Sequence, residues 1–213
     1  MCGRYLTPDQ AELERHWAVT SPPDYFQSYN VAPSQSSPVI GVDAQGASEA
    51  RMMTWGFKPS WAKRGWINAR SETAFTSSAF GRAARRHRCL VPAMGWYEWQ
   101  GEKPPKQPYV FHLDGFVPFA FAGIWTAGET SGSRLQSFAI LTRDATDDLK
   151  AIHNRMPVVL TSDHYGVWMA ADTDARVAEG LLTASSADIR AYRVSNYVNK
   201  PANNDPRCIE PVS

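Results

Sequence analysis

Short strand-like runs separated by turn residues most constrain how this chain can fold. Each run has four to seven residues, rich in Val, Ile, Phe, Tyr and Trp. Turn-rich stretches separate several of them, notably GEKPPKQP at 101–108 and AGETSGSR at 127–134. Short runs bounded in this way are typical of β-strands. The predicted strands are residues 37–42, 51–55, 89–92, 95–100, 109–113, 119–125 and 136–141.

Helical patterns lie between the strands without a strict alternation. Thr7 is a predicted cap, with Pro8 at the first helical position and Gln10 completing a capping box, for a helix that continues to about Trp17. Further helices are predicted at 77–86, 146–152, 162–169 and 174–182, and an irregular tail at 196–213. This mixture predicts an α+β fold: one domain over residues 2–213, with an antiparallel, barrel-like β core and several peripheral short helices.

Composition excludes several classes of protein. The chain has 213 residues, of which 43% are hydrophobic and 20% charged, as in ordinary globular domains. No apolar run approaches the roughly 18 residues of a membrane helix, and charged residues interrupt the N-terminal segment where a signal peptide would be apolar. Three cysteines are too few for a disulfide framework and lack zinc-ligand spacing, so we expect a cytoplasmic protein without metal or cofactor. A net charge of +1 restricts any nucleic-acid surface to a local patch.

The opening MCGRY raises a chemical question, because Cys2 directly follows Met1. Removal of Met1 would give Cys2 a free α-amine, whose ordinary pKa is about 7.7–8.0, beside its thiol. A 1,2-aminothiol condenses with an aldehyde to an imine and then closes to a five-membered thiazolidine. It can also attack an amide, with the amine as its own base. The alternative is that Cys2 is a small apolar residue tucked beneath the sheet.

Three other segments carry chemistry. In WINARSETA, an extended chain would place Asn68, Arg70 and Glu72 on one face. An amide and a guanidinium on one face could bind a phosphate or a carbonyl group. The alternative is that these residues form the polar edge of a loop. Glu98 lies between aromatic residues in GWYEW, where burial would raise its pKa, unless the side chain faces solvent. His153, at a helix end in AIHNRMP, is either a proton carrier or a structural histidine.

Six segments in order resemble the SOS-response-associated peptidase (SRAP) family, whose members crosslink to abasic sites in single-stranded DNA. They are MCGRY, YNVAP (29–33), WGFKPSW (55–61), INARSET (67–73), GWYEW (95–99) and HNRMP (153–157), and the likeness extends to the tail ending CIEPV. One departure is Asn154, where an Asp often follows the histidine. This residue is not the proton carrier, so the departure leaves the implied chemistry intact.

The resemblance implies a role for each matching residue. Cys2, freed of Met1, would form a thiazolidine with the opened sugar aldehyde, and Asn68 would position the sugar or the amine. Glu98 would move protons during ring opening, imine formation and slow reversal, with His153 as the acid–base partner near the sugar oxygen. DNA contacts are expected from phosphate-binding Arg4 and Arg70, and from Thr142 in AILTRDA.

Flat and basic side chains are candidates for the rest of the DNA surface. Trp61 and Pro33 could stack on bases, with Phe57 and Trp66 behind them. GRAARRHR (81–88) concentrates Arg82, Arg85, Arg86 and Arg88, together with His87, which predicts a basic ridge for phosphates. The alternative is a solvated helix face that complements the helix dipole. Cys89 and Cys208 are expected to be structural.

The expected function is therefore an abasic-site sensor with lyase-like chemistry and self-processing at Met1, shielding the lesion from cleavage and error-prone bypass. We expect a monomer that binds abasic single-stranded DNA, without a membrane, at the nucleoid if bacterial, with replication-fork proteins as candidate partners. An N-terminal-nucleophile glutaminase is the main alternative, since such enzymes also begin Met-Cys-Gly. A peptidase acting on other proteins and a plain single-stranded-DNA-binding module are two further alternatives.

Overall fold

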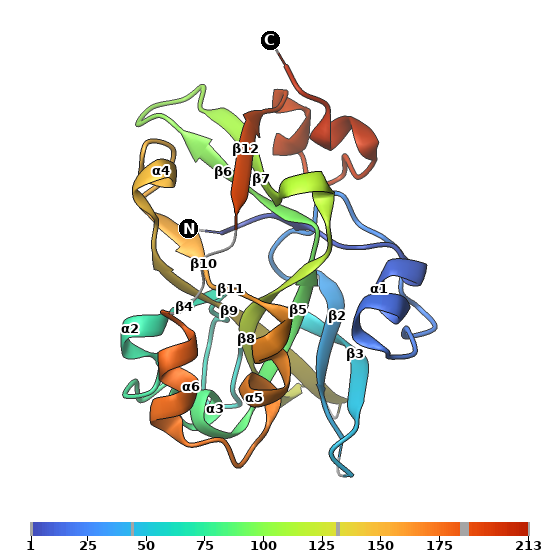
Figure 1. The fold of residues 1–213 in the computed structure, drawn as a ribbon, viewed down its shortest axis with the longest axis vertical. Helices are drawn as coiled ribbons and strands as arrows, with labels where there is room; N and C mark the ends of the chain where they lie inside the picture. Colours follow the sequence, from blue (N-terminus) through green and yellow to red (C-terminus); the bar gives the residue numbers. More distant parts are fainter. Residues whose placement is uncertain (1, 44, 131–132, 184–187, 213) are drawn as a thin grey trace.

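The computed structural model describes residues 2–43, 45–130, 133–183 and 188–212, and consists mostly of strands with a few short helices (Figure 1). Within these residues, five strands close into a barrel. Around the ring, each pairs with the next in the order β9, β3, β2, β5 and β8, and β8 pairs with β9 again. The strands are β2 (Ser36–Val42), β3 (Ser48–Trp55), β5 (Arg88–Ala93), β8 (Phe119–Thr130) and β9 (Ser133–Asp144).

The α+β class and the barrel are thus confirmed, with one correction to the strand directions. Most pairs are antiparallel, but β3 runs parallel to β9 and so does β4 (Asn68–Arg70). Two further short strands, β10 (Arg155–Pro157) and β11 (Val159–Leu160), pair with β9 and β8. Closure leaves the barrel strands without a free edge.

A second sheet of four strands lies above the barrel in Figure 1. Its order is β1 (Tyr5–Leu6), β6 (Gly95–Gln100), β7 (Gln107–Leu113) and β12 (Ile189–Arg193), and all its pairs are antiparallel. The N-terminal segment runs between this sheet and the barrel (Figure 1). This placement brings the start of the chain to the junction of the two sheets.

The helices lie at the periphery and are short. They are α1 (Gln10–Trp17), α2 (Ser71–Ala74), α3 (Gly81–Arg86), α4 (Asp147–Lys150), α5 (Tyr165–Met169) and α6 (Ala175–Leu181), with 3-10 turns η1 (Asp114–Phe116), η2 (Ser162–His164), η3 (Asn196–Asn199) and η4 (Pro206–Ile209). Over the described residues, no helix combines the length and apolar character needed to cross a membrane.

The predicted start of the first helix was wrong by two residues. Asp9 is the cap: its carboxylate accepts from the Glu12 N–H at 2.7 Å, and Glu12 accepts from the Asp9 N–H at 3.1 Å. Thr7 is buried instead, and its hydroxyl accepts from the Ser28 N–H at 2.8 Å. The capping box therefore begins two residues later than predicted, because the threonine is used to hold a loop.

Two other boundaries differ from the sequence prediction. The helix predicted at 77–86 begins at Gly81, after a turn in which the Ser77 hydroxyl accepts from the Ala79 N–H. The predicted turn at 127–134 is mostly strand: β8 continues to Thr130 and β9 starts at Ser133, and these two residues pair. Residues 131–132, at the centre of that turn, lie outside the described residues.

Aromatic side chains fix the N-terminal segment at the junction. The Tyr5 ring lies 5.1 Å from that of Trp55 and 6.0 Å from that of Phe121, both in edge-on geometry. Trp96 of β6 stacks on Phe111 at 5.0 Å. Such pairs add about 0.5–1.5 kcal/mol each beyond the burial of their area. The core therefore holds the residues next to Cys2 in one position.

Candidate functional site

Cys2 lies three residues before β1 and is fully buried with a free thiol. Backbone pairing with β6 fixes the course of the segment that follows Cys2: the Tyr97 N–H donates to the Arg4 carbonyl at 3.0 Å, and Tyr5 pairs with Trp96. The Cys2 Sγ points back toward the Arg4 carbonyl at 3.9 Å. The backbone of Arg4 and Tyr5 therefore fixes Cys2 beside the upper sheet.

Asn68 approaches Cys2 from the barrel. It opens β4, which lies parallel to β9 with Asn68 opposite Ile140. Its side-chain Nδ2 donates to the Cys2 carbonyl at 2.7 Å. Its Oδ1 is buried and accepts no hydrogen bond from the residues described. The amide thus holds Cys2 with one end and leaves its oxygen for another donor.

Glu98 and His153 complete the group. Glu98 is 3% exposed on β6, two residues beyond the partner of Tyr5. Its Oε2 lies 3.9 Å from Nε2 of His153, which follows α4 and precedes β10. Pairing of β10 with β9 brings this histidine to the junction. The four residues predicted to be catalytic therefore meet there, although they come from four separate segments.

Burial dominates the electrostatics of this cluster. Removal from water raises the pKa of Glu98 from 4.5 to about 7, and the positive amino terminus acts in the opposite direction. Burial, followed by the negative charge of Glu98, raises the pKa of the Cys2 thiol well above its usual range. Burial, followed by the charge of the amino terminus, lowers the pKa of His153. Near neutral pH, Glu98 can therefore both donate and accept a proton, beside a protonated thiol.

Arg155 is a site residue to which the sequence assigned no role. Its guanidinium bonds both carboxylate oxygens of Glu72, at 2.6 and 2.9 Å, the carboxylate of Asp144 at 2.6 Å and the Thr142 carbonyl at 2.7 Å. Its backbone N–H lies 3.0 Å from His153 Nδ1. These contacts anchor the turn that carries His153. The HNRMP motif indicated that this part of the sequence belongs to the site. It did not predict the role of Arg155, because ion pairs between residues distant in the sequence leave no local pattern.

The predicted shared face of Asn68, Arg70 and Glu72 is only partly correct. Asn68 and Arg70 lie on one strand, but the chain turns into α2 at Ser71. Glu72 is thereby redirected toward Arg155. The hydrogen bond from Arg155 is the main cause that lowers the pKa of Glu72, and the charge of the exposed Arg70 adds a smaller lowering. Arg70 is therefore accessible to a phosphate, whereas Glu72 is engaged in an ion pair.

Two residues predicted to contact DNA are buried. Thr142 is completely buried, and its hydroxyl lies 3.4 Å from the Ala69 carbonyl within the β4–β9 pair. Phe57 is 2% exposed and packs edge-on against Phe80 at 5.3 Å. Core packing places Phe57 behind the surface, in line with its predicted position behind Trp61 and Pro33. Strand pairing encloses Thr142, and its contact with DNA remains a prediction. They support the surface from behind.

Arg4 is largely engaged within the protein. Its Nη1 donates to Asn30 Oδ1 at 2.8 Å and to the Val198 carbonyl at 2.9 Å, and its Nη2 donates to the Asn199 carbonyl at 3.2 Å. These bonds join the N-terminal segment to the C-terminal tail. A phosphate contact by Arg4 remains a prediction that would use its remaining N–H groups.

The flat side chains predicted at the surface are accessible. Pro33 is exposed, and Trp61 is 64% exposed. Trp61 lies 5.8 Å from Trp66, whose ring packs edge-on against Phe80. An exposed indole supported by neighbouring aromatic rings offers a face to an external planar group. Base stacking by these residues remains a prediction.

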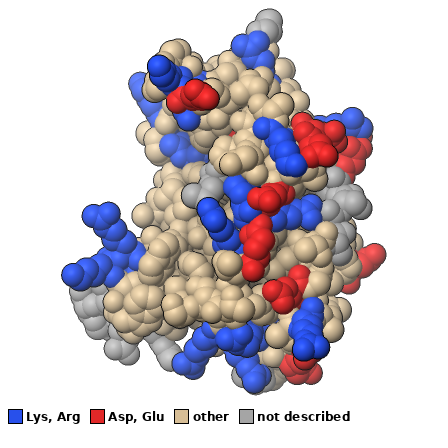
Figure 2. All heavy atoms as spheres, turned by 90° about the vertical axis from the view of Figure 1, so that its left-hand side faces the viewer, with Lys and Arg blue, Asp and Glu red and all other residues tan. Residues whose placement is uncertain are grey.

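The predicted basic ridge is smaller than its sequence indicates. Arg82, Arg85 and Arg86 are exposed on α3. Arg85 donates to the Phe75 carbonyl, and Arg88 is buried, with its Nε donating to the Trp168 carbonyl at 2.6 Å. In the face shown in Figure 2, Lys and Arg form separate groups with acidic side chains between them. Any phosphate contact on this face is therefore local.

Over the residues described, no group of three or more His, Cys, Asp or Glu side chains is arranged to hold a metal ion. The cluster at Cys2 instead combines a thiol, an amide, a carboxyl and an imidazole. These groups can position a carbonyl compound, transfer protons and supply a sulfur nucleophile.

Comparison with known proteins gives a consistent result. The chain is 37% identical over 223 residues to the abasic site processing protein YoqW of Bacillus subtilis, covering 99% of each chain. It is 29% identical over 226 residues to the abasic site processing protein YedK of Escherichia coli, covering both completely. A crystal structure of a phage-related protein from Bordetella bronchiseptica superposes with a TM-score of 0.74 at 29% identity, covering 91% of this chain and 94% of that one.

The family model described as SOS response associated peptidase (SRAP) matches residues 1–201. The match includes all four residues that meet at the junction of the two sheets. This chain therefore belongs to the SRAP family.

Proposed function

We propose that this protein processes abasic sites in single-stranded DNA by covalent capture through Cys2. The observation that carries the proposal is the meeting of Cys2, Asn68, Glu98 and His153 from four separate segments. The relatives named as abasic site processing proteins support the same substrate class. Met1, which lies outside the described residues, must be removed before Cys2 carries a free amine.

The proposed reaction joins two groups of Cys2 to one aldehyde carbon. The amine of Cys2 adds to the aldehyde of the ring-opened deoxyribose, and loss of one water gives an imine. The thiol then adds to the imine carbon, forming a carbon–sulfur bond while the nitrogen gains a proton. The product is a thiazolidine, and the net change is the loss of one water molecule. Slow reversal requires the same proton transfers in the opposite order.

Glu98 is the proposed proton carrier. A carboxyl with a pKa of about 7 is partly protonated at neutral pH, so it can protonate the carbinolamine hydroxyl, which leaves as water, and then accept the thiol proton. This second step is needed because burial keeps the Cys2 thiol protonated. His153, at 3.9 Å from Glu98, is the proposed partner near the sugar oxygen.

Asn68 is proposed to hold the reacting groups in place. Its Nδ2 already fixes the Cys2 carbonyl at 2.7 Å. The buried Oδ1 can accept from the amine of Cys2 or from a sugar hydroxyl. A buried acceptor gains most from such a bond, because leaving it unpaired costs about 1–3 kcal/mol.

Exposed residues near the site are proposed to hold the flanking strand. Arg70 lies two residues from Asn68 and can bind a phosphate. Pro33 and Trp61 can stack on bases, and Arg82, Arg85 and Arg86 can bind phosphates farther along the strand. Electrostatic contacts of this kind weaken as salt rises.

The central experiment is incubation of the Met1-free protein with an oligonucleotide containing one abasic site. We expect a complex that survives boiling in SDS, its loss in Cys2→Ala, and a less stable or reversible adduct with Cys2→Ser. An N-terminal tag that blocks Met1 removal should act like loss of the thiol. Absence of an SDS-resistant band with the Met1-free protein contradicts the proposal, and ammonia release from glutamine would instead identify a glutaminase.

Lyase-like chemistry and removal of Met1 by the protein itself belong to the same proposal. We infer that any peptidase activity is confined to Met1, and robust cleavage of casein would contradict this. We further propose a cytoplasmic monomer that protects the lesion from cleavage and error-prone bypass at the replication fork. Intact-protein mass spectrometry shows directly whether Met1 is absent from the mature chain.

A further inference from the structure

The loop between β6 and β7 carries a lysine to which the proposed function assigns no role. Lys106 is exposed and is the last residue before β7. A methyl group at Gly101, the first residue after β6, would lie 3.9 Å from the Lys106 Cα, so the two residues face each other where the loop leaves the sheet. Gln100 pairs with Gln107 at the same end of the hairpin. Lys106 therefore extends from a defined position at the end of the upper sheet.

This end of the sheet lies against the turn that carries His153. Gln100 Nε2 donates to the Ala151 carbonyl at 2.9 Å, and the Tyr109 hydroxyl donates to Gln100 Oε1 at 3.1 Å. Ala151 precedes His153 by two residues. Figure 1 shows the same arrangement, with the β6–β7 loop beside α4. The loop therefore lies at the rim of the candidate site.

The charge of Lys106 acts on the site. Burial is the main cause that lowers the pKa of His153, followed by the positive amino terminus, and the charge of Lys106 adds a smaller lowering. Lys106 makes no ion pair with any other described residue, whereas Lys150 on α4 pairs with Asp147 at 2.7 Å and Arg155 pairs with two carboxylates. An exposed cation without an ion pair can bind an anion from solution. Lys106 is thus an available positive charge beside His153.

The exposed Arg70 lies on the other side of strand β9. Arg70 of β4 and Pro157 of β10 both pair with Thr142 of β9. A residue in a sheet has one paired neighbour on each side, so β4 and β10 flank β9 on opposite sides. Asn68 opens β4, and His153 precedes β10. Arg70 and the β6–β7 loop therefore approach the site from its two flanks.

We propose that Lys106 binds the phosphate next to the abasic sugar on the His153 side of β9, while Arg70 binds the phosphate on the other side of that sugar. The inference rests on the proposed function and adds a phosphate contact from the upper sheet. The ammonium group of a lysine is a compact charge with three donors, which suits a single phosphate. Phosphate contacts fix the position of a strand, so two cations on opposite flanks would hold the sugar at Cys2.

The test combines a lysine variant with a neutral phosphate. Native binding is measured by fluorescence anisotropy in a Cys2→Ala background, with single-stranded oligonucleotides that contain one tetrahydrofuran abasic analogue. Two further probes carry an uncharged methylphosphonate at one or the other phosphate flanking the analogue. Lys106→Gln should weaken binding of the unmodified probe by about 2- to 5-fold, the range expected for an exposed ion pair. It should also reduce the slope of log affinity against log salt by about 0.7, the value for one lost contact to a single strand.

The assignment depends on coupling between the residue and one phosphate. The methylphosphonate at the phosphate bound by Lys106 should weaken binding of the Cys2→Ala protein, but not of the protein that also carries Lys106→Gln. Lys106→Arg should retain the sensitivity, and Arg70→Gln should show the same coupling with the other flanking phosphate. Coupling of Lys106 to neither phosphate identifies it as a solvated surface lysine and overturns the proposal. Coupling of both residues to the same phosphate also overturns it.

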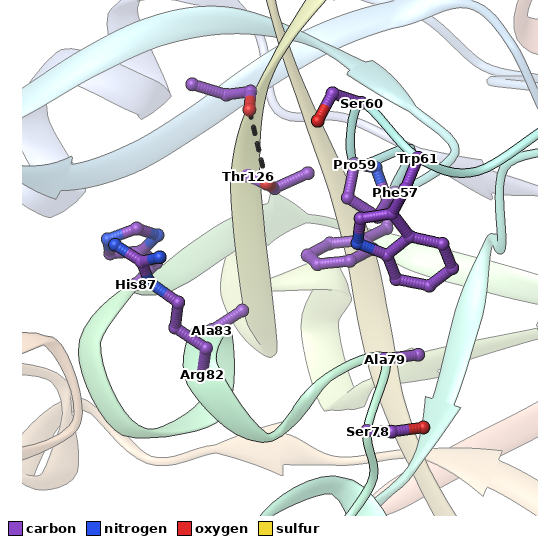
Figure 3. Close-up of a pocket in the computed structure, with 11 residues that line it drawn as sticks. Phe57, Pro59, Ser60, Trp61, Ser78, Ala79, Arg82, Ala83, His87 and Thr126 are labelled. Atoms are coloured by element: carbon purple, nitrogen blue, oxygen red, sulfur yellow. Dashed lines mark hydrogen bonds between the residues drawn. The ribbon is translucent and has the colours of Figure 1, made fainter.

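Two variants control for the loss of a positive charge. Lys103→Gln changes an exposed lysine of the same loop and should keep the full sensitivity to both methylphosphonates. Arg82, which Figure 3 shows beside His87, lines a pocket of about 450 Å³ that none of the four candidate catalytic residues lines. Arg82→Gln should therefore weaken binding of all three probes equally. Loss of the methylphosphonate effect in either control contradicts the assignment to Lys106.

The native assay separates this inference from the proposed function. If the wild-type protein forms the SDS-resistant complex but neither flanking phosphate couples to Lys106, this inference alone fails. If no covalent complex forms, the capture mechanism fails, while the coupling measured in the Cys2→Ala background still decides the role of Lys106.

Discussion

Substitution of Glu98 by glutamine should change the way stability depends on pH. Glu98 is 3% exposed, and burial raises its pKa from 4.5 to about 7. The folded protein therefore keeps this proton at pH values where the unfolded chain has lost it. Stability from the protonated carboxyl is complete below about pH 4.5 and is lost as the pH rises through about 7.

The size of the effect follows from the two pKa values. The interval from 4.5 to about 7, at about 1.36 kcal/mol for each pH unit, corresponds to about 3 kcal/mol. Glutamine is neutral at every pH and has nearly the same shape. Relative to wild type, Glu98→Gln should therefore gain about 3 kcal/mol in unfolding free energy between pH 4 and pH 8.5.

Urea unfolding followed by tryptophan fluorescence, at pH steps from 4 to 8.5, measures this difference. Glu102→Gln, at an exposed position in the β6–β7 loop, controls for the general loss of one carboxylate. A difference between Glu98→Gln and wild type that stays constant across the pH range refutes the argument. The same variant should slow both formation and release of the abasic-DNA complex, and unchanged rates for both would remove Glu98 from the proposed mechanism.

The remaining predictions separate chemistry, binding and packing. Cys2→Ala should abolish the SDS-resistant complex in gels but retain native binding to single-stranded DNA, since the proposed phosphate contacts lie elsewhere; loss of both would contradict this separation. Trp61→Ala should weaken that binding by about 1–3 kcal/mol in anisotropy titrations without lowering stability, and unchanged affinity would remove Trp61 from the interface. Phe57→Ala should instead cost about 3–5 kcal/mol of stability in urea; a near-neutral effect would show that its ring is not core. Asn30→Ala removes side-chain bonds to three tail carbonyls and Arg4, and should cost about 2–4 kcal/mol; tail protection from proteolysis that matches wild type would contradict this.

Local sequence determined the kinds of elements and much of the candidate chemistry. Short apolar and aromatic runs bounded by turn residues were sufficient for the β-rich α+β class, and the strand at Gly95–Gln100 was predicted with its observed bounds. Short motifs identified Cys2, Asn68, Glu98 and His153. These signals are readable because strand propensity and functional-group chemistry are properties of neighbouring residues.

Tertiary structure decided which of these groups meet and which side chains remain accessible. Parallel pairing of β4 with β9 brings Asn68 to Cys2, and the same pairing encloses Thr142. Packing buries Phe57, leaves Trp61 exposed, and assigns Glu72 to Arg155. The sequence placed Trp61 at the surface with Phe57 behind it, but it did not predict the burial of Thr142 or the Glu72–Arg155 ion pair. Burial and ion pairing depend on contacts between segments many residues apart, and the folding of the chain into the barrel fixes which of these segments become neighbours.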